Sequence, residues 1–309
     1  MSQDIPQRRN IAIALALQLV HLFQLAVLPL FLLPLSPWWL LALIPCALTT
    51  NPQWFLIHEA IHHGLSRDKE LNDGFGRALC VTLTVPFEVV RFGHLMHHRF
   101  NGALVDRPDL FDPSRTSRVK AWVGYYVQLL GGFFLLEAAS YAVFLLGPGA
   151  VGRVIDSRLD ADDPAEAEMA RLAQANLARP ETVRTLRNDA LTSYGLVALA
   201  FVLYGLQGFW WVPLCILLAR GLLISTANNL PHYDQPTGDI KHGLNTRLPR
   251  WAEPLLLNFN HHRTHHHKPT VPWTQLPKAT AERGDHMDIG YLRALLAQLK
   301  GPIAVRPRR

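Results

Sequence analysis

The chain has 309 residues, of which 49% are hydrophobic and 17% charged, and its formal net charge at pH 7 is +6. Its Lys and Arg residues are scattered between apolar blocks and form no aromatic-interleaved basic stripe, which argues against nucleic-acid binding. Only three cysteines occur, far apart and in apolar settings, so neither a disulfide framework nor a thiolate metal site is expected.

Two apolar segments begin the chain. Residues 11–33 carry no charge and are long enough to cross a bilayer, and the run exceeds the core of a cleaved signal peptide. We therefore expect an uncleaved membrane anchor. Gln18, His21 and Gln24 repeat within it at three-residue spacing, and we expect them to contact neighbouring helices. A charge-free turn leads to a second predicted span over 38–57.

Polar and apolar segments alternate through the rest of the chain. Residues 58–118 are polar and carry two histidine groups, whereas 119–147 is apolar but interrupted by Gly131-Gly132 and by Glu137. Residues 150–188 are charged and include a predicted surface helix. Two further apolar runs, 191–206 and 209–227, are predicted spans joined by a short turn, and the histidine-rich remainder is 228–309.

The distribution of Lys and Arg predicts the orientation. These residues concentrate at the N-terminus and in the histidine-rich regions, and they are absent from the turns at 34–37 and 207–208. The positive-inside rule then places 58–118, 150–188 and 228–309 in the cytoplasm. With both flanking regions on that side, 119–147 is predicted to lie in the interface or to re-enter. The expected fold is an all-α polytopic membrane protein with about four spans and a cytoplasmic histidine-rich helical cap.

Histidines cluster at three places along this predicted cap. Residues 260–269 contain five histidines in seven positions, too many polar rings for a packed core. At about 100° per residue, a helix puts the first, fourth and fifth rings of a His-x-x-His-His sequence on one face, and a His-x-x-x-His pair on one face as well. The aligned residues are His58 and His62, then His94, His97 and His98, then His262, His265 and His266.

A ninth candidate is His232, at the predicted cytoplasmic end of the last span. Asn228 lies four residues earlier on the same helical face, where it could hold a metal-bound water. Nine imidazoles exceed what one ion can use, whereas two ions with four or five rings each fit the count. Imidazole suits iron, zinc, copper and nickel, so the ligand type leaves the metal open. We expect no catalytic side chain beyond this centre.

Several further groups could orient the ligating rings by hydrogen bonds. The candidates are His63, His261, Glu59, Asp106, Asp109 and Asp234. Arg220, inside the last span, is costly there and could pair with Glu137, meet a substrate head group or reach the interface with its charged end.

Together, the three groups resemble the histidine boxes of the membrane fatty acid desaturase superfamily, with the pattern H-x3-H, H-x2-H-H and H-x2-H-H. The last box is similar to that family's Asn-x-His-x-x-His-His-x-x-Pro, here Asn260 to Pro269, and the following Val271-Pro-Trp is similar too. The extra His261 and His267 depart from the pattern. Asn228 and His232 match the family's water-holding asparagine and additional ligand.

This resemblance implies a non-haem di-iron centre and O2-dependent desaturation of an acyl chain in fatty acid biosynthesis. The substrate could be linked to a lipid, to CoA or to a carrier protein. Because no fused cytochrome domain is recognised, we expect a separate electron donor such as a ferredoxin or a cytochrome b5-like protein. We expect an integral protein of a bacterial inner membrane that contacts lipids and no nucleic acid.

Other readings remain open at this point. Hydroxylases, ketolases and acetylenases of the superfamily share the boxes. Residues 58–62 also spell H-E-x-x-H, the signature of zinc proteases, although such an enzyme has no use for seven further aligned histidines. A non-enzymatic metal carrier is a third possibility.

Overall fold

The computed structural model describes residues 4–305, which are mostly helical. Among these residues, the only strands are four of two residues each, and they form two parallel pairs: β1 (Leu110–Phe111) with β4 (Ile303–Ala304), and β2 (Thr246–Arg247) with β3 (Ile289–Gly290). The α-helices are α1 (Gln7–Leu22), α2 (Leu43–Leu48), α3 (Thr50–Ile61), α4 (Lys69–Leu83), α5 (Phe87–Phe100), α6 (Arg118–Val127), α7 (Phe133–Leu145), α8 (Pro148–Arg158), α9 (Pro164–Leu177), α10 (Pro180–Gly205), α11 (Val212–Asn229), α12 (His262–His267), α13 (Leu276–Glu282) and α14 (Tyr291–Ala297).

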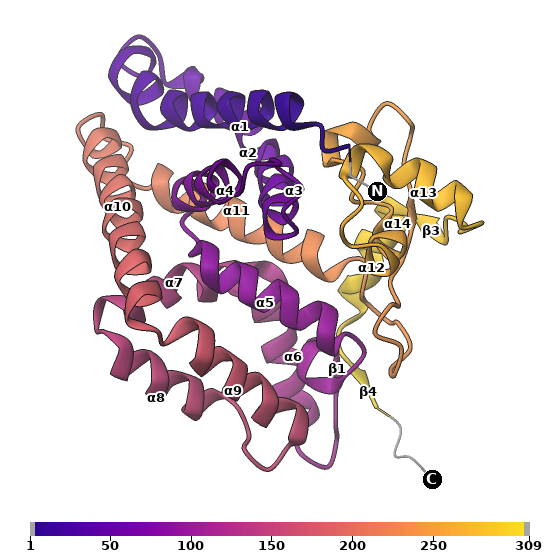
Figure 1. Ribbon diagram of the computed structural model, residues 1–309. Helices are drawn as coiled ribbons and strands as arrows, with labels where there is room; N and C mark the ends of the chain where they lie inside the picture. The colour runs from indigo at the N-terminus through magenta and orange to yellow at the C-terminus, as the bar shows by residue number, and fades with distance from the viewer. Residues whose placement is uncertain (1–3, 306–309) are drawn as a thin grey trace.

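Tighter or wider helical turns extend several of these helices. The segment η1 (Phe23–Leu32) continues α1, η2 (Pro37–Ala42) leads into α2, and η4 (Gln128–Gly132) joins α6 to α7. The remaining turns are η3 (Leu104–Asp106), η5 (Glu253–Leu256), η6 (Trp273–Gln275) and η7 (Gln298–Lys300). Figure 1 shows the third histidine box in α12 gathered with α13 and α14 at one end of the bundle, and α10 at the other.

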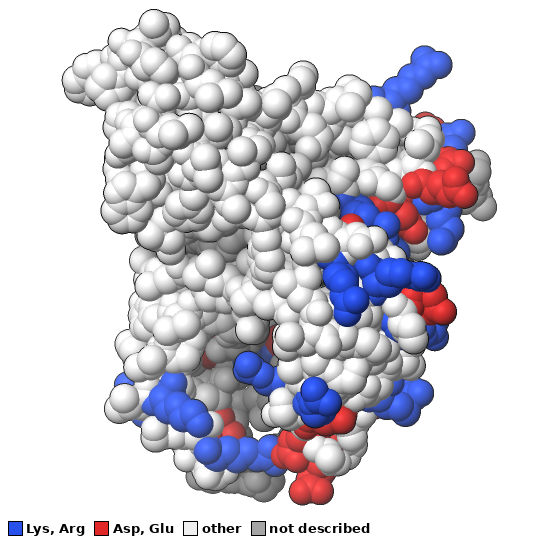
Figure 2. Space-filling model, turned by 90° about the vertical axis from the view of Figure 1, so that its left-hand side faces the viewer, with Lys and Arg blue, Asp and Glu red and all other residues white. Residues whose placement is uncertain are grey.

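Four helical segments within residues 4–305 are long and apolar enough to cross a bilayer: Gln7–Leu32, Pro37–Ile61, Arg118–Leu145 and Val212–Asn229. The predicted fold class, an all-α polytopic membrane protein, is confirmed. The predicted span 191–206 forms the second half of α10, whose first half is polar, and α10 is not among the four. Figure 2 shows a broad uncharged area on one face, with charged side chains gathered at its right and lower margins.

The segment from α6 to α7 is one long helical stretch with a local break at Gly131. Gly131 has a φ of +129°, which breaks the helix, and it packs so closely on Gly221 that a Cβ there would lie 3.4 Å from the Gly221 carbonyl carbon. On one side of this break α6 leads into η4, which packs on α11; on the other, α7 packs on α10, where Tyr194 donates to the Ala138 carbonyl at 2.9 Å. Because Arg118–Leu145 is also long enough to cross the bilayer, the interfacial or re-entrant placement of 119–147 stays a prediction until the membrane side of α8 is measured.

Trp273 fastens the segment that follows α12 to the first two spans. Its indole Nε1 donates to Asn10 Oδ1 at 2.9 Å, and its backbone N–H donates to Glu59 Oε2 at 3.2 Å. Its carbonyl accepts from Asn258 Nδ2 at 2.9 Å, and the Arg9 guanidinium lies 4.7 Å from the ring centre. A buried indole with every polar group paired fixes a chain segment firmly. The histidine-rich cap is therefore held against α1 and α3.

Cysteine labelling tests the path of 119–147. In a background with Cys46, Cys80 and Cys215 replaced by alanine, S157C on α8 should react with a membrane-impermeant maleimide from the same side as A281C on α13. L206C, at the opposite end of α10, should react only from the other side. Labelling of S157C together with L206C would mean that 119–147 crosses the bilayer once.

Candidate metal centre

Nine histidine rings from four distant segments meet at one end of the bundle. The first two come from the end of α3, three from α5, three from α12 and one from the turn after α11. They form two groups, in each of which the candidate ligand nitrogens all lie within 4.8 Å of one another. The five-ring group is His58, His62, His94, His98 and His265, and the four-ring group is His97, His232, His262 and His266.

In the five-ring group the Nε2 atoms face one another. His58 lies 3.0 Å from His265, and His62 lies 2.8 Å from His94, measured between Nε2 atoms. His98 Nε2 is 3.0 Å from both His94 Nε2 and His265 Nε2. The rings that each of these helices contributes lie on one face of that helix, as the spacing of the boxes predicts.

The four-ring group has the same geometry. His262 Nε2 lies 2.8 Å from His232 Nε2 and 3.0 Å from His266 Nε2, and His266 Nε2 lies 3.2 Å from His97 Nε2. His232 departs from the sequence prediction in one respect. It lies in a turn beyond the end of α11 at Asn229, not on the helical face that carries Asn228.

These spacings fit metal ions. An ion about 2.1 Å from each imidazole nitrogen, at angles between about 90° and 110°, puts neighbouring nitrogens about 3.0 to 3.4 Å apart. Burial holds the pKa values of His232, His262 and His265 well below the usual range, with neighbouring rings adding to the effect. The rings are therefore neutral near pH 7 and their lone pairs are available. The ligand role of each histidine stays a prediction.

Asp106 is the carboxylate that contacts one of the nine rings most directly. Its Oδ2 lies 2.7 Å from His97 Nδ1, which turns His97 Nε2 toward the four-ring group. Burial raises the pKa of Asp106, and the His97 ring opposes that rise. The neighbouring Asp109 accepts two hydrogen bonds from Arg107, each at 2.8 Å. This carboxylate therefore stabilises the loop and does not orient a histidine ring.

The other predicted orienting groups lie near the centre without hydrogen-bonding to its rings within residues 4–305. Glu59 accepts from the Trp273 backbone, and Asp234 donates its backbone N–H to Asp109. His63 is exposed, and His261 Nδ1 lies 2.8 Å from Thr280 Oγ1.

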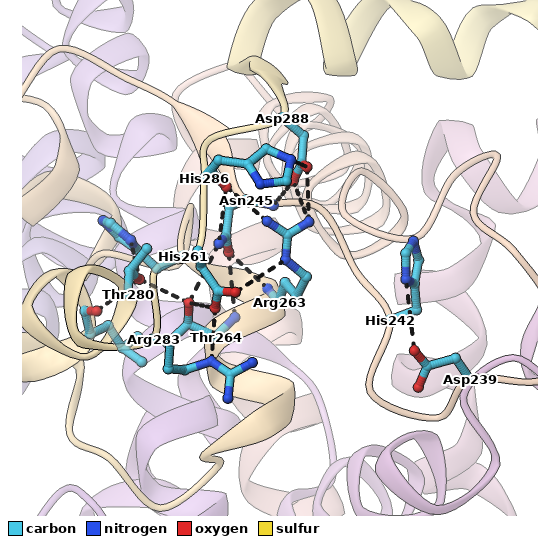
Figure 3. Close-up of polar contacts among 12 residues, drawn as sticks. Asp239, His242, Asn245, His261, Arg263, Thr264, Thr280, Arg283, His286 and Asp288 are labelled. Carbon is cyan, nitrogen blue, oxygen red and sulfur yellow. Dashed lines mark hydrogen bonds and ion pairs between the residues drawn. The ribbon is translucent and has the colours of Figure 1, made fainter.

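A polar network that the sequence did not predict holds α12 from its other face (Figure 3). Arg263 Nη1 donates to Asp288 Oδ1 at 2.8 Å, and the Arg263 backbone N–H donates to Asn245 Oδ1 at 3.0 Å. Thr264 Oγ1 donates to Asp285 Oδ2 at 3.0 Å. Helical geometry turns residues 263 and 264 away from the face that carries the ligating rings, which was the only signal available in the sequence.

A cavity of about 410 Å³ adjoins both histidine groups. His58, His94 and His262 contribute to its wall, and Asn228 lines it close to His232. Apolar side chains line another part of it, among them those of Trp54, Ile57, Val90, Phe133 and Phe259. The two groups of ring nitrogens therefore face a chamber with room for part of a small organic molecule.

The contacts of Arg220 exclude one of the roles that the sequence left open for it. Its Nη2 lies 3.0 Å from His21 Nδ1, and its Nη1 donates to the Thr82 carbonyl at 3.1 Å. The suggested pairing with Glu137 is wrong, because no ion pair joins these two residues. The polar residues of the first span contact neighbouring helices, as expected.

Comparison with known proteins agrees with this geometry. A model of the family described as "Fatty acid desaturase" matches residues 36–292. The chain is 28% identical over 243 residues to an acyl-lipid (9+3)-(E)-desaturase of Dimorphotheca sinuata, covering 74% of this chain and 61% of that protein. It is 30% identical over 251 residues to an omega-6 fatty acid desaturase, endoplasmic reticulum isozyme 1, of Glycine max, covering 74% and 60%.

A Momordica charantia Δ12 acyl-lipid conjugase (11E,13E-forming) is 24% identical over 251 residues, with coverages of 74% and 59%. The matched part of the chain thus spans about three-fifths of these relatives. The desaturases among these relatives are oxidoreductases. Because the family model covers most of the chain, including all nine clustered histidines, the protein belongs to the fatty acid desaturase family.

Proposed function

We propose that this chain is a membrane-bound, O2-dependent desaturase that introduces a double bond into an acyl chain, with two iron ions held by the nine histidines. The observation that carries the proposal is the arrangement of two groups of facing imidazole nitrogens beside one cavity. Bound iron would supply the oxidising power, derived from O2, that removal of hydrogen from an unactivated methylene requires, because no side chain supplies it.

The residues around the centre have separate tasks in this proposal. The nine rings hold the metal, and Asp106 fixes the direction of His97. The apolar wall, which includes Trp54, Phe133 and Phe259, excludes water and holds a methylene segment of the chain next to the histidine groups. Asn228 is placed to position a water near His232.

The substrate is proposed to be an acyl chain bound to a lipid, to CoA or to a carrier protein. Electrons are proposed to come from a separate ferredoxin or cytochrome b5-like protein, with the histidine groups on the cytoplasmic side of a bacterial inner membrane. Hydroxylation, ketone formation and acetylene formation are the alternative outcomes at the same centre. The zinc-protease reading is disfavoured, because Glu59 is bonded to the Trp273 backbone and makes no hydrogen bond to a ring.

Mass spectrometry of host acyl chains tests the reaction. Expression of the chain with supplied iron should yield acyl chains with two hydrogens fewer than their precursors. H262A, which removes a ring of the four-ring group, should give none of this product. A product with one additional oxygen atom would show that the reaction is hydroxylation and not desaturation. An unchanged acyl profile from cells that make the fully iron-loaded protein would contradict both reactions.

Metal content tests the ligand assignment. The purified wild-type protein should bind two iron ions per chain, one for each group of rings, and H265A or H262A should lose at least half of the iron. H286A is the matched control, because His286 is 77% exposed and contacts Asp288 instead of the nine rings. Retention of wild-type iron by both H265A and H262A, or one zinc per chain in the wild type, would refute the assignment.

The Asp106 contact predicts a graded effect. D106N should keep the fold but weaken metal affinity or activity by roughly 10- to 100-fold, because the carboxylate no longer orients the His97 ring. D112N is the control, since Asp112 is partly exposed and, among residues 4–305, its carboxylate hydrogen-bonds only to Ser114. Metal titration of the two variants side by side gives the comparison, and equal affinities would remove Asp106 from the centre.

A further inference from the structure

Glu137 is a partly buried acidic residue that the proposed chemistry does not use. It lies on α7, within a segment apolar enough to cross a membrane, and its Oε2 atom is buried without a hydrogen-bond partner among residues 4–305. An ionisable side chain at membrane depth is costly and is retained where it serves a function. An unpaired buried oxygen adds to that cost, so a partner is expected in the working protein.

The protein itself supplies no cation for Glu137 within the described part of the chain. Arg220, the basic residue of the neighbouring span α11, is bonded to His21 and to the Thr82 carbonyl. Arg107, which lines the same cavity, is bonded to both oxygens of Asp109. Among residues 4–305 no basic side chain pairs with Glu137, so its carboxyl group is open to a partner from outside the chain.

The position of Glu137 indicates where such a partner would bind. The side chain lines the cavity that also contacts His58, His94 and His262. The broken helix at Gly131 brings α7 against α11, where the Phe134 N–H lies 3.5 Å from Ser225 Oγ. Glu137 consequently faces the same chamber as the histidine groups.

Other polar side chains continue this part of the wall. Gln128, Ser225, Asn228 and Asn229 line the cavity from η4 and α11, opposite in character to the Trp54, Phe133 and Phe259 surface. A plain hydrocarbon chain would remove these groups from water and offer them no hydrogen bond. The cavity lining thus mixes apolar and polar side chains, and Phe133 and Glu137 lie four residues apart on the same face of α7.

We propose that Glu137 and its polar neighbours recognise a hydroxyl group on the acyl chain, so that the preferred substrate is a hydroxylated chain. A hydroxyl group donates to a carboxyl oxygen and accepts from the amide group of Gln128, whereas the Asn229 amide already donates to Gln298 Oε1 and to Tyr125. An ammonium group fits less well, because metal cations held by the nearby rings would repel it. This inference rests on the proposed function, because it names the substrate class of the same cavity.

Binding measurements test the preference for a hydroxylated chain independently of the proposed desaturase function. Octadecanoate and its 9-, 10- and 12-hydroxy derivatives, radiolabelled, would be bound to the iron-loaded wild type, E137Q, E137L and the exposed control E181L in detergent. At least one hydroxylated chain should bind the wild type and E181L about tenfold or more tightly than octadecanoate, since a site built to bond a hydroxyl discriminates against the chain that lacks it. E137L should bind both chains within about twofold, and E137Q, which keeps an acceptor, should retain part of the preference.

The outcomes are distinct. Equal binding of plain and hydroxylated chains by the wild type, or an unchanged preference in both E137L and E137Q, overturns the inference even if octadecanoate is desaturated. A preference that depends on Glu137 supports it even if no desaturation follows, in which case only the proposed function fails. Iron content and elution volume, measured for each variant, show whether E137L is folded, and E137Q decides the question if it is not.

Discussion

The structure depends on holding unprotonated imidazole nitrogens close together in two groups. Five Nε2 atoms converge in one group and four in the other, with neighbouring atoms 2.8 to 3.2 Å apart. A neutral ring has one donor and one lone pair, so an odd number of converging nitrogens cannot be satisfied by pairwise hydrogen bonds. Protonating the rings would bring like charges together in a dry site. A metal cation satisfies all the lone pairs at once, which explains why so many histidines can share so small a space.

The rest of the fold holds this arrangement in place. The four ligating segments are far apart in sequence, and each is fixed by contacts that do not involve the metal. Trp273 ties the chain after α12 to Asn10 and Glu59, and the Arg263–Asp288 pair holds α12 from its outer face. The helices α4 and α5 meet at 103°, which directs α5 and its three rings toward α3. Such support from outside the ligand set is what keeps a metal site in one geometry.

The sequence predicted the clustered residues well, because the helical period alone aligns each box on one face, and the helices at α3, α5 and α12 obey it. The prediction that His232 lies on the helix of the last span was wrong. The helix α11 ends at Asn229, and the residue spacing alone does not show where it ends. The partners of Arg263 and Thr264 named above lie 18 to 25 residues away and depend on how β2 and β3 pair, which no local pattern reports. Glu137 was visible as an acid in an apolar segment, but its place in the cavity lining depends on the packing of Gly131 and Phe134 against Gly221 and Ser225.

In the two proposals, the histidine groups hold the metal that carries out the chemistry, and the polar side chains of α7 and α11 that line the cavity select the acyl chain. All of this depends on metal held by imidazole. X-ray absorption at the iron edge of the purified, iron-loaded protein tests that claim most directly. The account predicts a first shell dominated by nitrogen at about 2.1 Å, with the outer-shell scattering of several imidazole rings for each iron. A shell of carboxylate oxygen or sulfur without imidazole scattering would contradict it.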